Sequence, residues 1–339
     1  MPIAPGPPSH ISANPTVTVF APTSSITVTI EAGGEDTDDI HFHAGGQGLW
    51  VARAILRLGE HPVLCTTTGG ESGVVLEALI NREGIGLDAI RVQRVSGAYV
   101  HDRRDRDHGR RSVAENRPGR LQRHELDDLY EAVLADCLVT GMVVITGRRS
   151  PHDVPDWFYR RLGWDLAETD TIVVGDFHGA ELRAFLDGGP VALLKVSSDD
   201  LAADGFTVDD DGHCREAIDA LGDLGVCDVV LTRGGESALA SIEGVTYRVT
   251  SLRVDSADCR GSGDAMTGAL AVGRLRGLDA ESLLALGSGA GSSSATRHGL
   301  ATADARLISE LAARCRIVAL APQPPPARTD PHAEPRSHD

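Results

Sequence analysis

The sequence is short of lysine, signal-peptide features and long apolar runs, and each shortage excludes a class of protein. Lys195 is the only lysine among 32 basic residues, which face 49 acidic ones, so the formal net charge is −17. A chain this acidic repels nucleic acid and anionic membranes, and we expect neither as a partner. No run of about 18 apolar residues predicts a membrane span. Residues 1–15 lack the charged and apolar regions of a signal peptide, so we expect a cytoplasmic protein.

Cysteine patterns that would predict a disulfide framework or a metal centre are also missing. The six cysteines contain no C-x-x-C pair, and a chain of 339 residues can bury a core without covalent cross-links. Aromatic residues make up only 4%, so the core must be largely aliphatic, and the 38 glycines indicate many tight turns. An apolar fraction of 41% with 24% charged residues fits one large α/β domain or two smaller domains.

Strand-like and helix-like segments alternate between two proline-rich ends. Residues 1–15 and 322–339 are rich in proline, so we expect disordered tails around one domain at residues 16–321. Strands are predicted at residues 16–20, 63–67, 142–146, 171–174, 191–194 and 228–232, and helices at residues 49–58, 73–83, 124–138, 155–162, 180–186 and 214–224. This alternation predicts a mostly parallel sheet covered by helices on both faces.

Two polar, strand-like stretches, residues 24–43 and 91–117, contain no helix between their strands. We expect them to form a small β-sheet lid beside the main sheet. Because exposed strand edges tend to pair, the lid predicts a homodimer in which two lids meet. The charged run at residues 101–111 is interpreted as a solvated hairpin tip, with a phosphate clamp as the alternative.

The most specific chemical motif reads Asp-Cys-Arg-Gly-Ser-Gly-Asp over residues 258–264, just before a helix-like segment. Gly261, Ser262 and Gly263, here called the C-terminal glycine corner, allow a ligand to approach the backbone, and the N–H groups and dipole of the helix attract an anion. Asp264 would then stand beside the bound anion, where it could take a proton from an attacking hydroxyl. The alternative is a glycine-rich turn capped by an aspartate.

A second glycine-rich turn, the N-terminal glycine corner at residues 45–48, also runs into a helix. Together with the lid, the two corners resemble the phosphofructokinase-B (ribokinase-like) family of sugar kinases, nearest its 1-phosphofructokinase and tagatose-6-phosphate kinase branch. The stretches similar to that branch are residues 45–48, 51–53, 58–59, 116–119, 143–147, 176–179, 194–195, 200–201, 230–239 and 261–264.

The resemblance implies an α/β fold, a ribokinase-like three-layer sandwich with a mostly parallel central sheet, and transfer of the γ-phosphoryl group of ATP, with Mg²⁺, to a sugar or sugar phosphate. Asp264 falls on the family's catalytic base, and the C-terminal glycine corner falls on its anion hole. The positions that contact ATP fall on Lys195, Ser197, Thr232, Gly234, Gly235, Ser288, Gly291 and Ser292. The positions that contact the sugar fall on Ser25, Gly45, Gly46 and Trp50, and metal-linked positions fall on Asp200 (indirectly) and Asp258.

The expected sugar contacts depart from the family pattern more than the expected nucleotide contacts. Gln47 stands in place of a lysine, Trp50 in place of an asparagine, and Ser25 near the position of an aspartate. Trp50 either stacks on a sugar or base, or simply fills the pocket. Ser197 and Asp200 occupy the positions of the Asn and Glu of the family's NxxE motif, which tunes metal and phosphate geometry.

The lid also lacks the phosphate-binding arginine that the family has within the segment matched by residues 96–99. Arg148 and Arg149 lie in the loop that borders the same site in the family, and paired arginines suit a phosphate group. We therefore predict that one of them binds an anionic group of the substrate. The alternative is an exposed, solvated loop.

Two classes of function fit this pattern. The first is an active kinase for a sugar or sugar phosphate, or for a changed substrate such as a nucleoside. The second is a weak or inactive relative that binds nucleotide or sugar phosphate as a sensor. The retained Asp264 favours the first class, and the altered sugar contacts favour the second.

Overall fold

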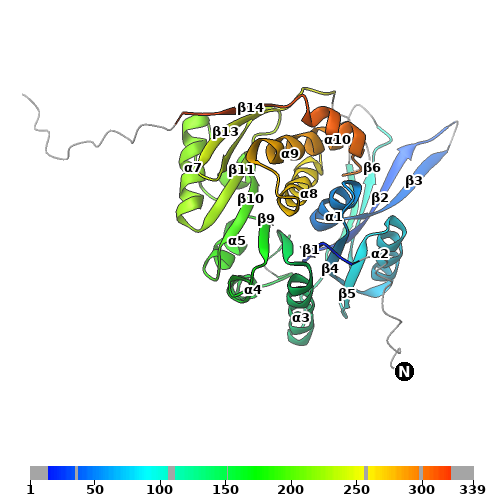
Figure 1. Ribbon diagram of the computed structural model, residues 1–339. Coiled ribbons are helices and arrows are strands. Elements are labelled where there is room, and N and C mark those ends of the chain that lie inside the picture. The colour runs from blue at the N-terminus through cyan, green and yellow to red at the C-terminus, as the bar shows by residue number, and fades with distance from the viewer. Residues whose placement is uncertain are drawn as a thin grey trace, which may run out of the picture.

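The computed structural model describes residues 14–34, 37–105, 111–150, 152–255, 259–297 and 301–321 (Figure 1). Residues 1–13 and 322–339, most of the two predicted tails, lie outside this range. The described residues form a ten-stranded main sheet and a separate four-stranded sheet. Across the main sheet the strands are β14 (Arg316–Ala319), β13 (Val245–Thr250), β12 (Ala238–Ile242), β11 (Val226–Thr232), β10 (Val191–Ser197), β9 (Ile172–Asp176), β8 (Met142–Thr146), β1 (Val17–Ala21), β4 (Pro62–Thr68) and β5 (Gly86–Arg91).

Helices cover the main sheet on both faces, as the sequence predicts, and each face has its own apolar core. The core on one face includes residues of α3 (Arg123–Thr140), α4 (Asp156–Ala167), α5 (Gly179–Leu186), α6 (Ser198–Ala203) and α7 (Asp211–Asp223). The core on the other includes residues of α1 (Gln47–Arg57), α2 (Gly70–Glu83), α8 (Ser262–Leu275) and α9 (Ala280–Ala295), and α10 (Ala305–Ala312) packs on α9. None of the described helices is both long and apolar enough to cross a membrane.

Seven neighbouring strands of the main sheet, β11 to β5, run parallel, which confirms the predicted mostly parallel sheet. The antiparallel edge of β12, β13 and β14 was not foreseen from the sequence. Glycines mark the ends of two helices close to the predicted positions. Gly84 follows α2 and Gly141 follows α3, both with positive φ, and such left-handed residues terminate helices.

The predicted lid is present as a sheet of its own, with the strand order β3 (Asp38–Gly45), β2 (Ser25–Ala32), β6 (Gly97–Asp102) and β7 (Arg111–Asn116). It projects beside α1 and α2 beyond the main sheet (Figure 1). The sheet is mixed, because β2 pairs parallel with β6 and antiparallel with β3. Its predicted bounds need small corrections: Arg91 still belongs to main-sheet strand β5, and β3 extends to Gly45.

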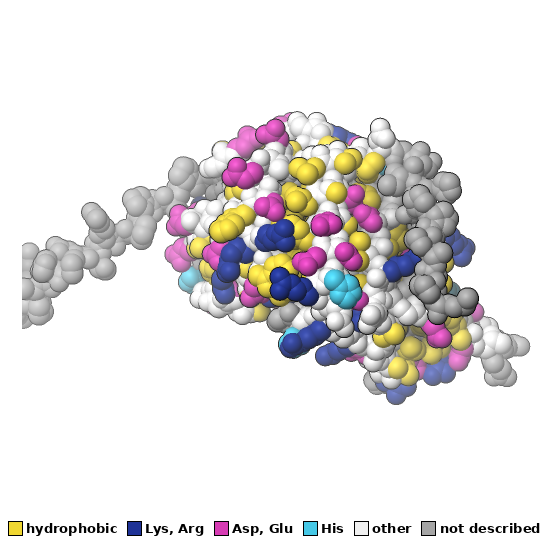
Figure 2. Space-filling view, turned by 90° about the horizontal axis from the view of Figure 1, so that it is seen from below, with side chains coloured by type: hydrophobic (Ala, Val, Ile, Leu, Met, Phe, Trp, Pro, Cys, Tyr) yellow, Lys and Arg dark blue, Asp and Glu magenta, His cyan; other side chains and the backbone are white. Residues whose placement is uncertain are grey.

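The described part of the charged run, residues 101–105 and 111, forms ion pairs within the lid. Asp102 pairs with Arg104 and Arg111, and Arg104 also pairs with Asp38. Residues 106–110 lie outside the described range. Elsewhere, too, charges of both signs are mixed: on the face shown in Figure 2, acidic and basic side chains are interspersed with apolar ones.

Helices α1 and α8 begin at the two glycine corners, and their close packing depends on Gly268. A Cβ atom at this position would lie 2.7 Å from the carbonyl oxygen of Val51 and 2.8 Å from the Cβ atom of Ala54. Any side chain here would therefore push the two helices apart.

We expect Gly268→Ala to lower the free energy of unfolding by about 1–3 kcal/mol, because it overpacks the α1–α8 contact. Gly222→Ala in α7 is the matched control. Its Cβ would meet nothing within 4 Å, so it should instead stabilise the protein by about 0.5–1 kcal/mol. Urea unfolding of both variants checks this, and equal stability of the two would contradict the packing argument.

Candidate active site

The C-terminal glycine corner forms the beginning of α8. Gly261 is the N-cap residue, with φ of 74°, a conformation that favours glycine. The N–H groups of the first helical turn have no partner within the helix, so they and the helix dipole can bind an anion. The hydroxyl of Ser262 is buried and has no hydrogen-bond partner among the described residues. The corner thus has the polar groups that a phosphoryl group would need.

A buried ion pair lies beneath this corner. Lys195 on β10 contacts the carboxylate of Asp176, at the end of β9, at 3.2 and 3.4 Å. The hydroxyl of Thr267 in α8 donates to the same carboxylate at 2.7 Å. A Cβ atom on Gly263 would lie 2.6 Å from the Lys195 ammonium nitrogen, so the lysine fills the space that a side chain at residue 263 would take.

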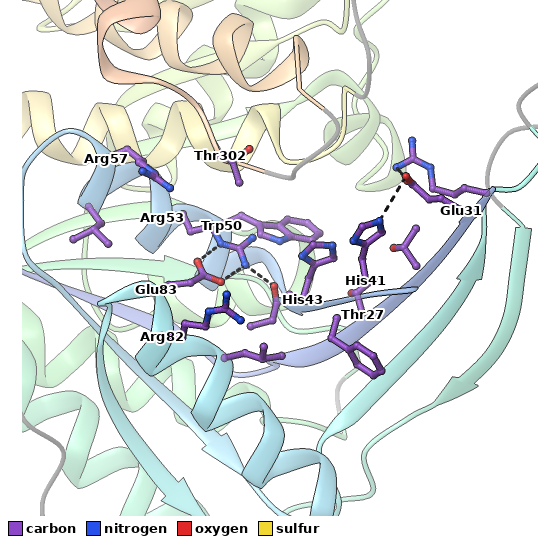
Figure 3. A pocket seen from close by; sticks show the side chains of 17 residues that line it. Thr27, Glu31, His41, His43, Trp50, Arg53, Arg57, Arg82, Glu83 and Thr302 are labelled. Atoms are coloured by element: carbon purple, nitrogen blue, oxygen red, sulfur yellow. Dashed lines mark hydrogen bonds and ion pairs between the residues drawn. The ribbon is translucent and has the colours of Figure 1, made fainter. Parts of the chain in front are cut away.

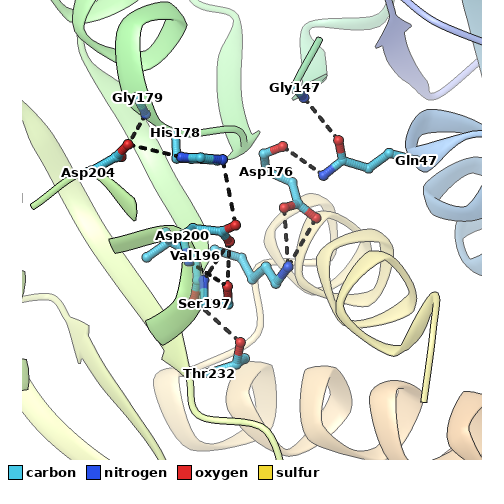
Figure 4. A network of polar contacts seen from close by, with 11 residues as sticks. Gln47, Gly147, Asp176, His178, Gly179, Val196, Ser197, Asp200, Asp204 and Thr232 are labelled. Atoms are coloured by element: carbon cyan, nitrogen blue, oxygen red, sulfur yellow. Dashed lines mark hydrogen bonds and ion pairs between the residues drawn. The ribbon is translucent and has the colours of Figure 1, made fainter. Parts of the chain in front are cut away.

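The backbone around Asp176 is tied to the N-terminal glycine corner by Gln47. Its amide nitrogen donates to the carbonyl oxygen of Asp176 at 2.9 Å, and its carbonyl oxygen accepts from the N–H of Gly147 at 3.1 Å (Figure 4). Gln47, which replaces the family's lysine, therefore joins α1 to the carboxyl ends of β8 and β9. No role was predicted for Asp176 or Gln47 from the sequence, although strands that end side by side bring such residues together.

Asp264 lies in the first turn of α8, where the charges of this ion pair shift the pKa of its carboxyl. Burial raises the pKa of its carboxyl, the negative charge of Asp176 raises it further, and Lys195 opposes both, so that the pKa is about 7. Burial disfavours the charge on Lys195, but the attraction of Asp176 and Asp264 outweighs it and raises the pKa of the lysine. The lysine is therefore a fixed cation, and Asp264 exchanges its proton near neutrality.

The residues matched to ATP contacts divide into two groups. Lys195, Ser197 and Thr232 lie near one another at the carboxyl ends of β10 and β11, where the Ser197 and Thr232 positions pair in register. Ser197 and Asp200 form a capping box that begins α6, so each holds the other's backbone N–H group. Asp200 also lies 3.6 Å from His178.

The other matched ATP positions follow β11 or lie on α9. Gly234, with φ of 57°, and Gly235 form an open turn in which an added Cβ would meet nothing within 4 Å. Ser288 is buried, and its hydroxyl bonds to that of Ser251 at 2.7 Å. Gly291 and Ser292 lie one turn further along α9, where a Cβ atom on Gly291 would contact the carbonyl oxygen of Ser262 at 3.2 Å. These α9 positions thus adjoin the C-terminal glycine corner.

The residues matched to sugar contacts meet where the lid joins the main body. Ser25 begins β2 and pairs with Gly45 at the end of β3. Gly46 has φ of 116°, and a Cβ atom there would lie 2.8 Å from the carbonyl oxygen of Thr23. The glycines of this corner are therefore required by the close approach of chain segments, whatever else they contact.

A pocket of about 700 Å³ lies between the lid, α1 and α2 (Figure 3). Trp50 lines it and also packs against a small buried cluster of Ala54, Ala265 and Ala301. His41 and His43 of β3, which sequence reasoning missed, line the same pocket with their rings 6.0 Å apart. Burial lowers the pKa of His43, and the positive charge of Arg53 and a charged His41 lower it further, which favours the neutral imidazole.

Arg148 is not available to a substrate, which corrects half of the predicted anion clamp. Its side chain is only 3% exposed, and its guanidinium contacts Asp156, Glu181 and the carbonyl oxygen of Val154. Arg149 is more accessible. It lies 4.5 Å from the centre of the Tyr99 ring and 2.9 Å from the carboxylate of Glu115, both in the lid.

The acidic residues around Lys195 are suitable oxygen ligands for Mg²⁺. Asp176, Asp200 and Asp264 interact electrostatically, and Lys195 is the cation that faces them. Carboxylate oxygens are the donors that this hard cation prefers. Asp258, the other predicted metal-linked residue, lies outside the described residues.

These features define an α/β protein in which a glycine corner begins a helix directly above a buried ion pair. Residues 22–306 match the pfkB family of carbohydrate kinases, so the chain belongs to this family. It is a phosphotransferase that acts on the hydroxyl of a sugar or sugar phosphate.

Two sets of known proteins are similar to the chain. "ATP-dependent 6-phosphofructokinase isozyme 2" of Mycobacterium tuberculosis is 27% identical over 80% of both chains, and "1-phosphofructokinase" of Haloferax volcanii is 27% identical over 73% of this chain and 78% of its own. Phosphofructokinase-2 from Escherichia coli in complex with potassium has a TM-score of 0.79 at 21% identity, covering 88% of this chain and 98% of its own. Arabidopsis thaliana ribokinase complexed with ribose and ATP has a TM-score of 0.68 at 19% identity, with 88% and 99% covered. The solved structures confirm the predicted ribokinase-like fold.

The raised pKa of Asp264 has a consequence for stability. Its carboxyl binds a proton more tightly in the folded than in the unfolded state, so its contribution to stability is lost as the pH rises through about 7. We expect Asp264→Asn to raise the melting temperature at about pH 8, and the gain to shrink toward about pH 5.

Asp211→Asn serves as the control of opposite sign. Burial tends to raise the pKa of Asp211, but its contacts with Arg248 and Arg233 lower it, so its charge stabilises the fold. Its replacement should lower the melting temperature at about pH 8. An Asp264→Asn variant that melts below the wild type at this pH would refute the electrostatic assignment.

Proposed function

We propose that the protein transfers the γ-phosphoryl group of ATP to a hydroxyl of a sugar or sugar phosphate, with Asp264 as the general base. The observation that carries this proposal is the position of Asp264 in the first turn of α8, directly after the C-terminal glycine corner and above Lys195. Burial and the charge of Asp176 raise the pKa of its carboxyl to about 7, which supports the proposal. A base with such a pKa is available at neutral pH and still holds the proton it removes.

The six cysteines are free, which fits the reducing cytoplasm as the proposed location.

The C-terminal glycine corner would bind the transferring phosphoryl group through backbone N–H groups of α8, a geometry that costs no reorganisation during the reaction. Lys195, Ser197, Thr232, Gly234, Gly235, Ser288, Gly291 and Ser292 remain the proposed ATP contacts, with Ser288 supporting α9 from its buried position. Mg²⁺, held by Asp176 with Asp200 acting indirectly, would supply positive charge that neutralises the phosphates. Lys195 would hold the carboxylate of Asp176 in place, and Asp264 would stay clear of the metal so that it can accept the proton.

The general-base proposal predicts that Asp264→Asn lowers kcat at least ~10²-fold while nucleotide binding persists. In the wild type, kcat/KM should rise with pH through about 7, because the base must be ionised. Lys195→Met should move this limb to higher pH, since it removes the cation that favours ionised Asp264. Steady-state kinetics across pH check both effects.

Asp199→Asn is the control for this experiment, because Asp199 is an exposed carboxylate of the neighbouring α6. It should leave the rate and the pH profile unchanged. Near wild-type turnover by Asp264→Asn, with any accepted substrate, would exclude Asp264 as the base. Nucleotide binding without turnover in the wild type would favour the sensor.

The acceptor would bind in the pocket lined by Trp50, His41 and His43, next to Ser25 and the N-terminal glycine corner. Arg149 remains the proposed contact for an anionic group. A second candidate is a kinase for an acceptor with a planar group, such as a nucleoside, because Trp50 and the two imidazoles form one wall of the pocket (Figure 3). At the α1–α2 end, Arg57 and Arg82 line the pocket and enter no ion pair with another described residue.

Replacing Arg149 and Arg82 in turn distinguishes a phosphorylated acceptor from a neutral acceptor such as a nucleoside. If Arg149 holds a phosphate of the acceptor, Arg149→Ala should raise KM for phosphorylated acceptors about 10- to 150-fold, which corresponds to about 1.5–3 kcal/mol, and leave KM for unphosphorylated acceptors unchanged. Arg82→Ala, which alters an arginine that lines the pocket at its α1–α2 end, is the matched comparison. A loss confined to Arg82→Ala would place the anion there, and equal small effects on all acceptors would favour a nucleoside or another neutral acceptor.

The lid is the proposed dimer interface. Ile40 and Phe42 on β3 are 55% and 57% exposed, and register places Ile30 and Val28 of β2 opposite them, which makes one lid face apolar. Exposed apolar patches and open strand edges of this kind mark interaction surfaces. Among the similar structures is one of a "tetrameric inhibited form" of E. coli phosphofructokinase-2.

We expect the wild type to sediment as a dimer at micromolar concentration and Phe42→Asp to sediment as a monomer, because a charge on the apolar lid face must be desolvated on pairing. Val74→Asp is the control. Val74 is 70% exposed but lies on α2 in the main body, so this variant should remain dimeric. A monomeric wild type, or a dimeric Phe42→Asp variant, would exclude the lid as the interface.

A further inference from the structure

A second group of ionisable side chains lies on the other face of the main sheet from α8. Cys65 on β4 pairs in register with Asp88 on edge strand β5, and Asp136 lies on α3, which packs on this face of the sheet. The Cys65 sulfur and one carboxylate oxygen from each aspartate all lie within 4.8 Å of one another. This cluster, here called the α3 cluster, shares no residue with the candidate active site.

The α3 cluster is part-buried, and no described cation pairs with it. Cys65 has no exposed surface, whereas Asp88 and Asp136 are half-buried, and the Cys65 thiol makes no hydrogen bond with a described residue. Oxygen Oδ2 of Asp136 is also buried without a partner among the described residues. Burial raises the pKa of both carboxyls, and the charge of Asp88 adds to the shift at Asp136, which reaches about 7.

The four aspartates that are buried in the described structure have cationic partners, unlike the two half-buried aspartates of the α3 cluster. Asp102 pairs with Arg104, Asp153 with Arg94, Asp176 with Lys195, and Asp228 with Arg274. No described arginine, lysine or histidine pairs with either aspartate of the α3 cluster. Two carboxyls and a thiol that converge without a positive charge have the composition of a cation site, and a convergent buried thiol is the independent feature that points to a metal.

We propose that Cys65, Asp88 and Asp136 bind a divalent transition-metal ion, and that Zn²⁺ suits the site best. Thiolate is a poor ligand for Mg²⁺ and Ca²⁺, whereas Zn²⁺ accepts sulfur and carboxylate oxygen together. Three protein ligands leave a fourth tetrahedral position for water. Binding displaces the thiol proton and any carboxyl proton into solvent, so that the ion meets a thiolate and two carboxylates.

The ion would tie α3 to the edge of the main sheet. Strand β5 continues through residues 92–96 into lid strand β6, and the N–H of Gln93 on this connection already donates to Glu125 at the start of α3. A metal between β4, β5 and α3 would fasten the same segment at a second place. The site would therefore be structural, at the root of the lid and on the far face of the sheet from the phosphoryl-transfer centre.

Titration of the purified full-length protein with Co²⁺, a spectroscopic substitute for Zn²⁺, tests the proposal without knowledge of the acceptor. The expected result is a near-ultraviolet thiolate-to-Co²⁺ charge-transfer band that saturates at one ion per chain and is displaced by Zn²⁺. Cys65→Ser should abolish the band, whereas Cys227→Ser, which alters an exposed cysteine on β11, should retain it. Absence of the band in the wild type, or its persistence in Cys65→Ser, would overturn the proposal.

Asp136→Asn provides a second, nearly isosteric test if Cys65→Ser fails to fold. Zn²⁺ should raise the melting temperature of the wild type, because it binds the folded chain preferentially. The variant should bind Zn²⁺ at least ~100-fold more weakly, beyond the loss typical of residues that only support a ligand. Equal stabilisation of the wild type and Asp136→Asn by Zn²⁺ would show that the ion binds elsewhere.

Discussion

The ion pair between Lys195 and Asp176 is the interaction on which the rest of the active site depends. It joins neighbouring strands β9 and β10, receives a hydrogen bond from α8 through Thr267, and lies directly under Gly263. Removal of one partner from such a buried pair typically costs about 3–5 kcal/mol, because the other charge is left uncompensated. The pair therefore fixes the height of α8 above the sheet, and the same charges set the proton affinity of Asp264.

Only part of this centre was visible in the sequence. The glycine corners could be predicted because backbone recognition of phosphate requires small residues at fixed places before a helix. Asp176 could not be paired with Lys195, since a parallel crossover separates them and only the sheet register brings them together. For the same reason Arg148 was overrated as a substrate contact: its partners Asp156 and Glu181 belong to two different helices.

The same contrast holds for the fold: features with a pattern along the chain were predicted, and features that depend on contacts between distant segments were not. Alternation of strands and helices predicted the parallel sheet, and polar strand patterns predicted the lid. The antiparallel edge had a local signal that was overlooked: Glu243 and Gly244, both with positive φ, form the two-residue turn between β12 and β13. The α3 cluster had no signal, because Cys65, Asp88 and Asp136 become neighbours only after β4, β5 and α3 have assembled.

The two halves of the active site therefore differ in how strongly sequence similarity constrains them. In the proposed phosphate site, backbone N–H groups at α8 keep their positions as long as Gly261 and Gly263 keep their conformation, so this half tolerates extensive substitution elsewhere. The proposed acceptor half consists largely of side chains that alternate along lid strands, where every second residue faces the pocket. Each such position, as His41 and His43 illustrate, can change without altering the fold. Identity of 27% to phosphofructokinases thus supports the phosphoryl-transfer chemistry far more strongly than it supports fructose phosphate as the acceptor.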